Sequence, residues 1–248
     1  LAEILKNIDP TKGDIEQQLA DEILKLPLEE QEALNESIEE SGMFSFVALM
    51  TPFHSQLNVR PNQILPKATA LNYYLENYQS TLEDEGLIYM SSYGNNNDMM
   101  GTYIPSKTES SWNSATITHE DYNIERLAEE EIVAGYSCKK ALYTLKNPTS
   151  IEFSGNPLSL MVYTTASMPK ELNFQHPFYI PEDNGILKID VTYDTAEKNK
   201  MVYEIVKVES KEMEDEDFEI QRSTNMYDLD AEDPSAGLAM MAIMFGYE

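Results

Sequence analysis

The chain has 248 residues, of which 44 are Asp or Glu and only 17 are Lys or Arg, so its formal net charge is -27 at pH 7. Nucleic acids and anionic lipid surfaces are bound through clustered Lys and Arg, and this charge argues against both kinds of partner. Apolar residues make up 42% of the chain, which is enough to fill a globular core.

Residues 14–40 are predicted to form two short amphipathic helices. Their apolar residues recur at helical intervals, at Ile15, Leu19, Ile23, Leu26, Leu34 and Ile38. Asp14 and Gln17 have the spacing of a capping box, and Pro27 stands where a second helix can begin. Gly42 is placed to end that helix, so residues 1–42 are predicted to be an N-terminal helical segment.

Residues 43–222 are predicted to form a core of antiparallel strands. Residues 43–50 are almost entirely apolar, as in a buried strand, whereas Pro52, Pro61 and Pro66 predict a long connection over residues 51–70. Residues 71–82 fit either a helix or a strand, and a strand is favoured by their tyrosines and the turn that follows. The other predicted strands are separated by polar turns; one, residues 132–145, is longer, and the rest are short: residues 87–92, 99–104, 115–118, 158–165, 186–193 and 201–208. Gly135 is predicted to form a bulge within one of them.

The strand at residues 186–193 has the clearest pattern, because apolar and polar side chains alternate along it. Residues 201–208 follow a polar turn and are its expected antiparallel partner. Many short strands at this spacing favour an α+β fold with a curved antiparallel sheet or partial barrel, in a single domain over residues 1–248.

Residues 223–248 are predicted to be a C-terminal tail that is first acidic and then rich in methionine. Its uncharged end carries Met240, Met241 and Met244, which are expected to lie in a short helix or strand docked on the core. Contact with an apolar ligand is the alternative role for these methionines.

No motif indicates a catalytic residue, a cofactor or a metal. His54, His119 and His176 lack the close spacing of metal ligands or of a catalytic pair. The phosphate-binding loops and the nucleophile elbow GxSxG are also absent from the sequence.

A stretch with Asp228, Asp230 and Asp233 resembles the start of a calcium-binding loop. Ala239 stands where the loop needs a bidentate Glu, so an exposed acidic linker is the better interpretation. Cys138 is the single cysteine; the chain can form no internal disulfide, and this thiol is predicted to be buried in a strand and unreactive.

The chain begins at Leu1 instead of methionine, as a mature protein does after removal of an export signal. We therefore expect export. No apolar run approaches the ~18 residues that a membrane-spanning helix needs, and the longest, residues 238–245, has the sequence LAMMAIMF.

Three segments within residues 70–222 share an order of residues with a known family. They contain Gly135, Cys138, Lys139 and Lys140, then Tyr163, Thr164 and Pro169, and finally Asp217, Phe218 and Ile220. The chain thus resembles an uncharacterised family of exported proteins of Gram-negative bacteria, which carry a domain of unknown function with a GxxCKK strand. The resemblance implies a fold similar to the lipoprotein-localisation factors LolA and LolB, in which a curved antiparallel sheet wraps as a half-barrel around helices and leaves an apolar concavity.

The sequence therefore predicts a non-enzymatic envelope protein, periplasmic or at the cell surface, that binds a lipid or a lipidated protein in this concavity. The alternative is an acidic surface or assembly module that acts through protein or divalent-cation contacts without catalysis. A hydrolase that uses buried carboxylates is a third hypothesis. The sequence assigns no ligand-binding residue and no oligomeric state.

Overall fold

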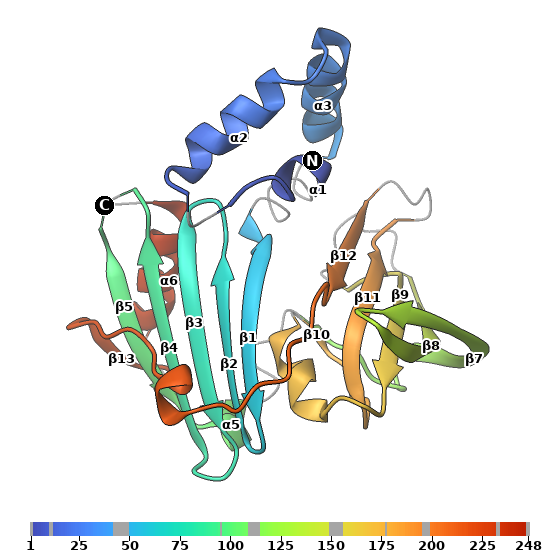
Figure 1. The fold of residues 1–248 in the computed structure, drawn as a ribbon, viewed down its shortest axis with the longest axis vertical. Helices are drawn as coiled ribbons and strands as arrows, with labels where there is room; N and C mark the ends of the chain where they lie inside the picture. The colour runs from blue at the N-terminus through green and yellow to red at the C-terminus, as the bar shows by residue number, and fades with distance from the viewer. Residues whose placement is uncertain are drawn as a thin grey trace.

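The computed structural model describes residues 2–9, 12–41, 50–94, 96–108, 115–148, 156–176, 178–194, 199–231 and 234–246. Its strands form two large sheets that are mainly antiparallel, and helices accompany them, so the fold class is α+β as predicted. Figure 1 shows the two sheets beside each other, with the N-terminal helices above them.

The N-terminal segment contains α1 (Ala2–Leu5), α2 (Ile15–Leu24) and α3 (Leu28–Ser41). Helix α2 begins after Asp14, whose Oδ1 accepts a hydrogen bond of 2.9 Å from the Gln17 amide. Helix α3 begins after Pro27. Both predicted helices are confirmed, whereas Gly42 and the strand predicted to follow it lie outside the described residues apart from Met50.

The first sheet has six strands, in the order β1-β2-β3-β4-β5-β13. They are β1 (His54–Arg60), β2 (Gln63–Thr69), β3 (Tyr73–Ser80), β4 (Glu85–Ser92), β5 (Asp98–Tyr103) and β13 (Met226–Asp228). Neighbours among β1 to β5 are antiparallel, and β13 runs parallel to β5. The strands predicted at residues 71–82, 87–92 and 99–104 are confirmed.

The prediction of a long connection over residues 51–70 is wrong, because β1 and β2 form a hairpin there. Pro66 lies inside β2, opposite Leu57 of β1. The pairing of β2 with β3 is interrupted at Leu65 and Pro66. A proline has no N–H to donate, so this interruption is where the sheet accommodates it.

The second sheet has five strands, in the order β12-β11-β9-β8-β7. They are β7 (Tyr122–Val133), β8 (Tyr136–Leu145), β9 (Ser159–Thr165), β11 (Gly185–Thr192) and β12 (Lys200–Glu204), all antiparallel to their neighbours. The pairing predicted for residues 186–193 with 201–208 is confirmed, although β12 ends at Glu204. Two short strands, β6 (Ala115–Thr116) and β10 (Phe178–Tyr179), pair with each other in parallel and form a separate small sheet.

The prediction of one strand over residues 132–145 with a bulge at Gly135 is also wrong. Ala134 has a φ of 48° and Gly135 a φ of 86°. Two successive residues with positive φ make the tight turn typical of a two-residue β-hairpin. This turn joins β7 to β8, with Val133 opposite Tyr136.

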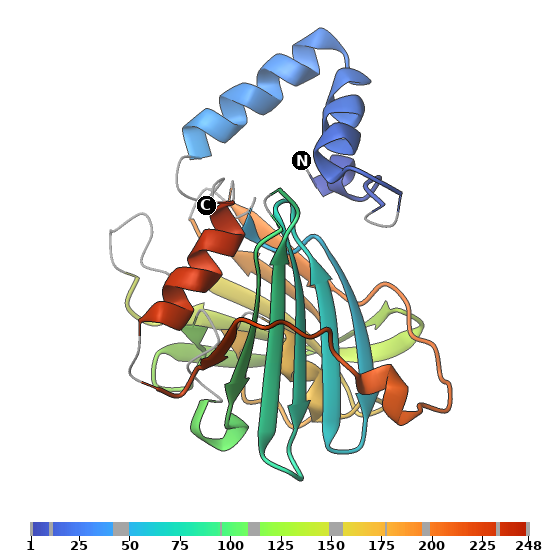
Figure 2. The ribbon, with the colours of Figure 1, turned by 90° about the vertical axis from the view of Figure 1, so that its left-hand side faces the viewer.

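Both faces of the first sheet are apolar and both are covered by later parts of the chain. On β4, Ile88 and Met90 face the helix α6 (Ser235–Phe245) and pack in one cluster with Ile243. Tyr89 points to the opposite face, where it packs with Phe218 and Ile220. These last two belong to residues 205–225, which we call the strap and which cross the sheet in Figure 2.

Polar contacts fix the strap in place. The carboxylate of Glu76, which is 2% exposed, accepts a 2.6 Å hydrogen bond from the Gln221 amide and pairs with Lys67 at 3.2 Å. Asn58 donates a 2.7 Å hydrogen bond to the carbonyl oxygen of Asp217, which lies in the short helix η2 (Asp215–Phe218). The strap is therefore an integral layer of the fold.

The helix η1 (Lys170–Gln175) links the two sheets, since it contacts β1, β2 and β11. Its Leu172 belongs to a core cluster with Leu187 of β11, against which Leu57 and Val59 of β1 pack. A short helix α5 (Pro105–Thr108) follows β5. Among the described residues, no helix has the length and apolarity needed to cross a bilayer.

We expect Phe218→Ala to lower the free energy of unfolding by about 3 kcal/mol, because Phe218 is 6% exposed and its removal leaves a cavity under the strap. The Arg60 guanidinium, 4.5 Å from the centre of the ring, would lose its aromatic partner as well. Urea unfolding followed by circular dichroism measures the change. Val206→Ala in the same strap is the control, since Val206 is 82% exposed and its truncation should have almost no effect. Equal stabilities of the two variants would contradict an ordered strap.

Candidate functional site

A large bulge in β7 opens the second sheet at one place. Arg126 lies opposite Ala141 and Glu130 lies opposite Lys139, so three residues of β7, 127–129, face the single residue Lys140 of β8. Bulges of this kind bend a strand away from its partner and re-aim nearby side chains. The bulge therefore creates a recess beside β8.

This recess, which we call the bulge cleft, is mostly polar. Its wider half has a volume of about 560 Å³ and its narrower half about 260 Å³. The wider half is within the usual size range of small-molecule sites. The residues that line both halves are Glu130, Lys139, Thr164 and Asn184.

A buried carboxylate lies in the wider half of the cleft. The Glu182 side chain is 6% exposed, and its Oε1 accepts a 2.6 Å hydrogen bond from Arg126 Nη1 and another from the Tyr143 hydroxyl. Burial raises the pKa of Tyr143, and the hydrogen bond to Glu182 and its negative charge raise it further. Tyr143 is thus a neutral donor, and Glu182 is already paired within the protein.

The position of Glu182 is set by Asn173 of η1. The Asn173 Nδ2 donates to the carbonyl oxygens of Glu182 and Asn184, at 3.3 and 3.1 Å, and its Oδ1 accepts from the Ile186 amide at 2.7 Å. One side chain thereby satisfies three backbone groups of the loop that precedes and enters β11. The cleft wall formed by this loop is consequently held by the same helix that links the two sheets.

Two polar groups in the cleft have no partner in the part of the chain that the structure describes. The Thr164 hydroxyl makes no hydrogen bond, although the residue is only 6% exposed. Buried hydroxyls are normally hydrogen-bonded, and leaving one unpaired is costly. The ammonium group of Lys139, across the pair Lys139–Thr164 of β8 and β9, likewise has neither a hydrogen bond nor an ion pair.

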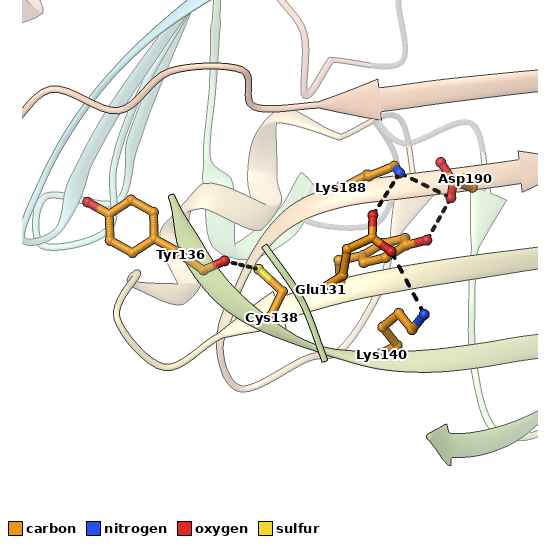
Figure 3. Close-up of polar contacts among 7 residues, drawn as sticks. Glu131, Tyr136, Cys138, Lys140, Lys188 and Asp190 are labelled. Carbon is orange, nitrogen blue, oxygen red and sulfur yellow. Dashed lines mark hydrogen bonds and ion pairs between the residues drawn. The ribbon is translucent and has the colours of Figure 1, made fainter. Parts of the chain in front are cut away.

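A charged network on the neighbouring surface of the same sheet is, by contrast, internally satisfied. In Figure 3, Glu131 lies between Lys140 and Lys188, with nitrogen–oxygen distances of 3.8 and 3.5 Å. Lys188 also pairs with Asp190 at 3.5 Å, and Asp190 accepts a 2.9 Å hydrogen bond from the buried Tyr163 hydroxyl. These groups have each other as partners, so the network stabilises the sheet instead of offering a ligand site.

The single thiol and the histidines do not meet in a site. Cys138 is 0% exposed, as predicted, and burial raises the pKa of its thiol. Its Sγ lies 3.6 Å from the carbonyl oxygen of Tyr136 (Figure 3). His54 and His119 are exposed, whereas His176 is buried and its Nε2 donates to the carbonyl oxygen of Ile186 at 3.2 Å.

The acidic stretch near the C-terminus is bound to backbone groups. Asp228 accepts a 3.0 Å hydrogen bond from the Asp230 amide, and Asp230 accepts one of 2.8 Å from the Ile104 amide, while Asp233 lies outside the described residues. Within the described ranges, no three His, Cys, Asp or Glu side chains are grouped as metal ligands.

Sequence reasoning did not identify the cleft. Lys139 and Thr164 belong to the segments that carry the family resemblance, but no role follows for them from it. Arg126, Glu130 and Glu182 have no distinguishing pattern in an acidic chain. The register shift in β7 and the hydrogen bonds of Asn173, neither of which the sequence reveals, bring them together.

Comparison with known proteins gives no functional assignment. No family model matches the chain, and no curated protein sequence matches it. A solved structure of a protein named PNGF-II aligns with a TM-score of 0.33 at 14% sequence identity, over 75% of this chain and 30% of that one. The chain therefore spans less than a third of the length of that protein. Neither the exported family nor the LolA and LolB factors gain support from these matches.

We expect His176 to make stability fall with acid. Burial lowers its pKa from 6.5 to about 4, so the unfolded chain takes up this proton near pH 6.5 and the folded chain does so only near pH 4. The stability that the neutral imidazole contributes is present above pH 6.5 and is lost between pH 6.5 and 4, by about 3 kcal/mol.

Urea unfolding at several pH values measures this effect. His176→Gln keeps a hydrogen-bond donor but cannot titrate, so its stability should fall less steeply over this range than that of the wild type. His119→Gln, at an exposed position, is the control and should follow the wild-type curve. If all three curves have the same slope, His176 does not titrate as the structure implies.

Proposed function

We propose that the chain is a non-enzymatic binding protein that holds a small hydrophilic ligand in the bulge cleft. The observation that carries this proposal is the Thr164 hydroxyl, which is buried, lines both halves of the cleft and has no partner among the described residues. A bound ligand would supply the missing hydrogen bond, which would offset the cost of burying this group.

The chemistry of the cleft supports binding over catalysis. A general acid or base needs a pKa near the working pH and access to the substrate. Tyr143 has a raised pKa, so it keeps its proton and donates a hydrogen bond to Glu182, whose buried carboxylate also pairs with Arg126. His176 and Cys138 do not line the cleft. The buried carboxylate of the cleft, Glu182, is therefore already paired within the protein, which favours binding over the hydrolase hypothesis.

We expect Thr164→Val to weaken ligand binding without weakening the fold. Valine has nearly the volume of threonine, and replacing an unpaired buried hydroxyl by a methyl group removes the cost of burying that hydroxyl, so the variant should be as stable as the wild type or slightly more stable. The measurement is a thermal-shift and NMR screen of the full chain against small amino acids, monosaccharides and carboxylates.

Thr144→Val is the matched control, because Thr144 is an exposed threonine of β8 outside the cleft lining. Solutes that shift the wild type and Thr144→Val but act at least several-fold more weakly on Thr164→Val would support the proposal. If no solute binds the wild type, or if all three proteins bind alike, the cleft is not the ligand site.

A second candidate is the predicted contact with lipid, which one observation favours. Helix α6 docks on the first sheet as predicted, through Met240, Met244 and the buried Ile243. Leu238 and Met241 of the same helix remain 64% and 52% exposed. Exposed apolar side chains on an otherwise apolar helix are suited to contact with an acyl chain or another apolar partner.

Native mass spectrometry after incubation with an envelope lipid extract tests this second function. We expect retained lipid in the wild type and at least a several-fold reduction in Met241→Lys. Val206→Lys, in the strap where Val206 is 82% exposed, is a control for the added charge. A wild-type protein that retains no lipid would eliminate this candidate.

The half-barrel form, the apolar concavity and the likeness to lipoprotein-localisation factors remain predictions, and so does a periplasmic or cell-surface location. The bulge cleft does not depend on any of them. An acidic assembly module that acts through protein contacts likewise remains the alternative to both ligand hypotheses.

A further inference from the structure

Glu130 and Lys139 are opposite charges on directly opposing residues of β7 and β8. Cross-strand pairs of this kind usually attract and stabilise a sheet. Here the two side chains form no ion pair: the Glu130 carboxylate accepts a hydrogen bond from the Ser137 hydroxyl, and the Lys139 ammonium has no partner in the described structure. A positive and a negative group thus remain separate on the lining of one cleft.

Three of the other charged groups at the cleft, those of Arg126, Glu182 and Lys140, are paired with neighbours. Arg126 pairs with Glu182, and Lys140 is paired with Glu131. Asp183 lines only the wider half. Among the described residues that line the narrower half, only Glu130 and Lys139 are charged. They are accompanied by hydroxyl and amide side chains: Ser137, Thr164, Thr165, Ser167 and Asn184.

Such a lining complements a ligand with one charge of each sign. A carboxylate would pair with Lys139, and an ammonium group would pair with Glu130, while the Thr164 hydroxyl can donate to the first or accept from the second. The net charge of -27 repels anions at long range, but a molecule of zero net charge experiences no such repulsion. The volume of about 260 Å³ restricts the ligand to a small molecule.

We propose that the narrower half of the bulge cleft binds a zwitterion, that is, a small molecule with one ammonium and one carboxylate group, of which the α-amino acids are the simplest. This inference rests on the proposed function, and it adds the chemical class of the ligand. The two charges of the ligand replace the direct Glu130–Lys139 pair that the protein itself does not form.

Isothermal titration of the full chain with glycine, L-alanine and L-serine, each alone, tests the inference. Acetate represents the carboxylate half of the zwitterion, methylammonium represents the ammonium half, and glucose offers hydroxyl groups without charge. We expect at least one amino acid to bind ten-fold more tightly than acetate, methylammonium or glucose.

Charge-removing variants assign the two halves of the ligand. Lys139→Gln should weaken amino-acid binding ten-fold and abolish acetate binding, while methylammonium binding is kept. Glu130→Gln should also weaken amino-acid binding ten-fold, but it should abolish methylammonium binding and keep acetate binding. Lys207→Gln is the matched control, because Lys207 is an exposed lysine of the strap that pairs with Glu209. It removes the same charge elsewhere and should bind as the wild type does.

Two outcomes would overturn the inference in distinguishable ways. If glucose or another uncharged solute binds as tightly as the amino acids and neither variant changes it, the zwitterion is wrong while the proposed function stands. If the wild type binds no amino acid, no half-molecule and no solute of the thermal-shift screen, both the inference and the proposed function fail.

Discussion

The first sheet imposes the main constraint on this fold, because it is apolar on both faces. A strand sends alternate side chains to opposite sides, and here each side of β4 carries large apolar residues that must be removed from water. Neither face can be covered by the second sheet alone. The strap and α6, which both come from the last fifth of the chain, provide the two coverings, and the buried Glu76 carboxylate fixes where the strap crosses.

The second sheet has a different constraint, because its edge strand β7 must not pair with another sheet. This edge strand is strongly charged. Glu125, Glu129 and Glu130 along this strand are exposed, which discourages pairing with a second copy of the sheet. The bulge in the same strand interrupts the ladder and produces the cleft. The same bulge thus makes β7 a poorer partner for an additional strand and brings together the polar groups on which the functional proposal rests.

Sequence patterns predicted the elements whose side chains obey a simple period. The alternation over residues 186–193 identified β11, and the helical spacing after Asp14 identified α2. The hairpin β1–β2 was missed because its prolines suggested a loop, although Pro66 is tolerated where the β2–β3 ladder is interrupted. The cleft could not be predicted, since it depends on a register shift of β7 against β8 and on the distant Asn173 that holds Glu182 in place. Both are tertiary effects that leave no local signature.

The order of the covering layers has a consequence for how the protein is made. Strand β5 ends at Tyr103, whereas the strap begins about 100 residues later, so at about 5 to 20 residues per second a ribosome needs roughly 5 to 20 s to reach the strap. During that interval the five antiparallel strands of the first sheet are synthesised but lack both coverings. The nascent chain is most prone to aggregation during this interval. Repulsion between acidic side chains of neighbouring chains, and any chaperone that shields apolar strands, therefore matter most before the fold is complete.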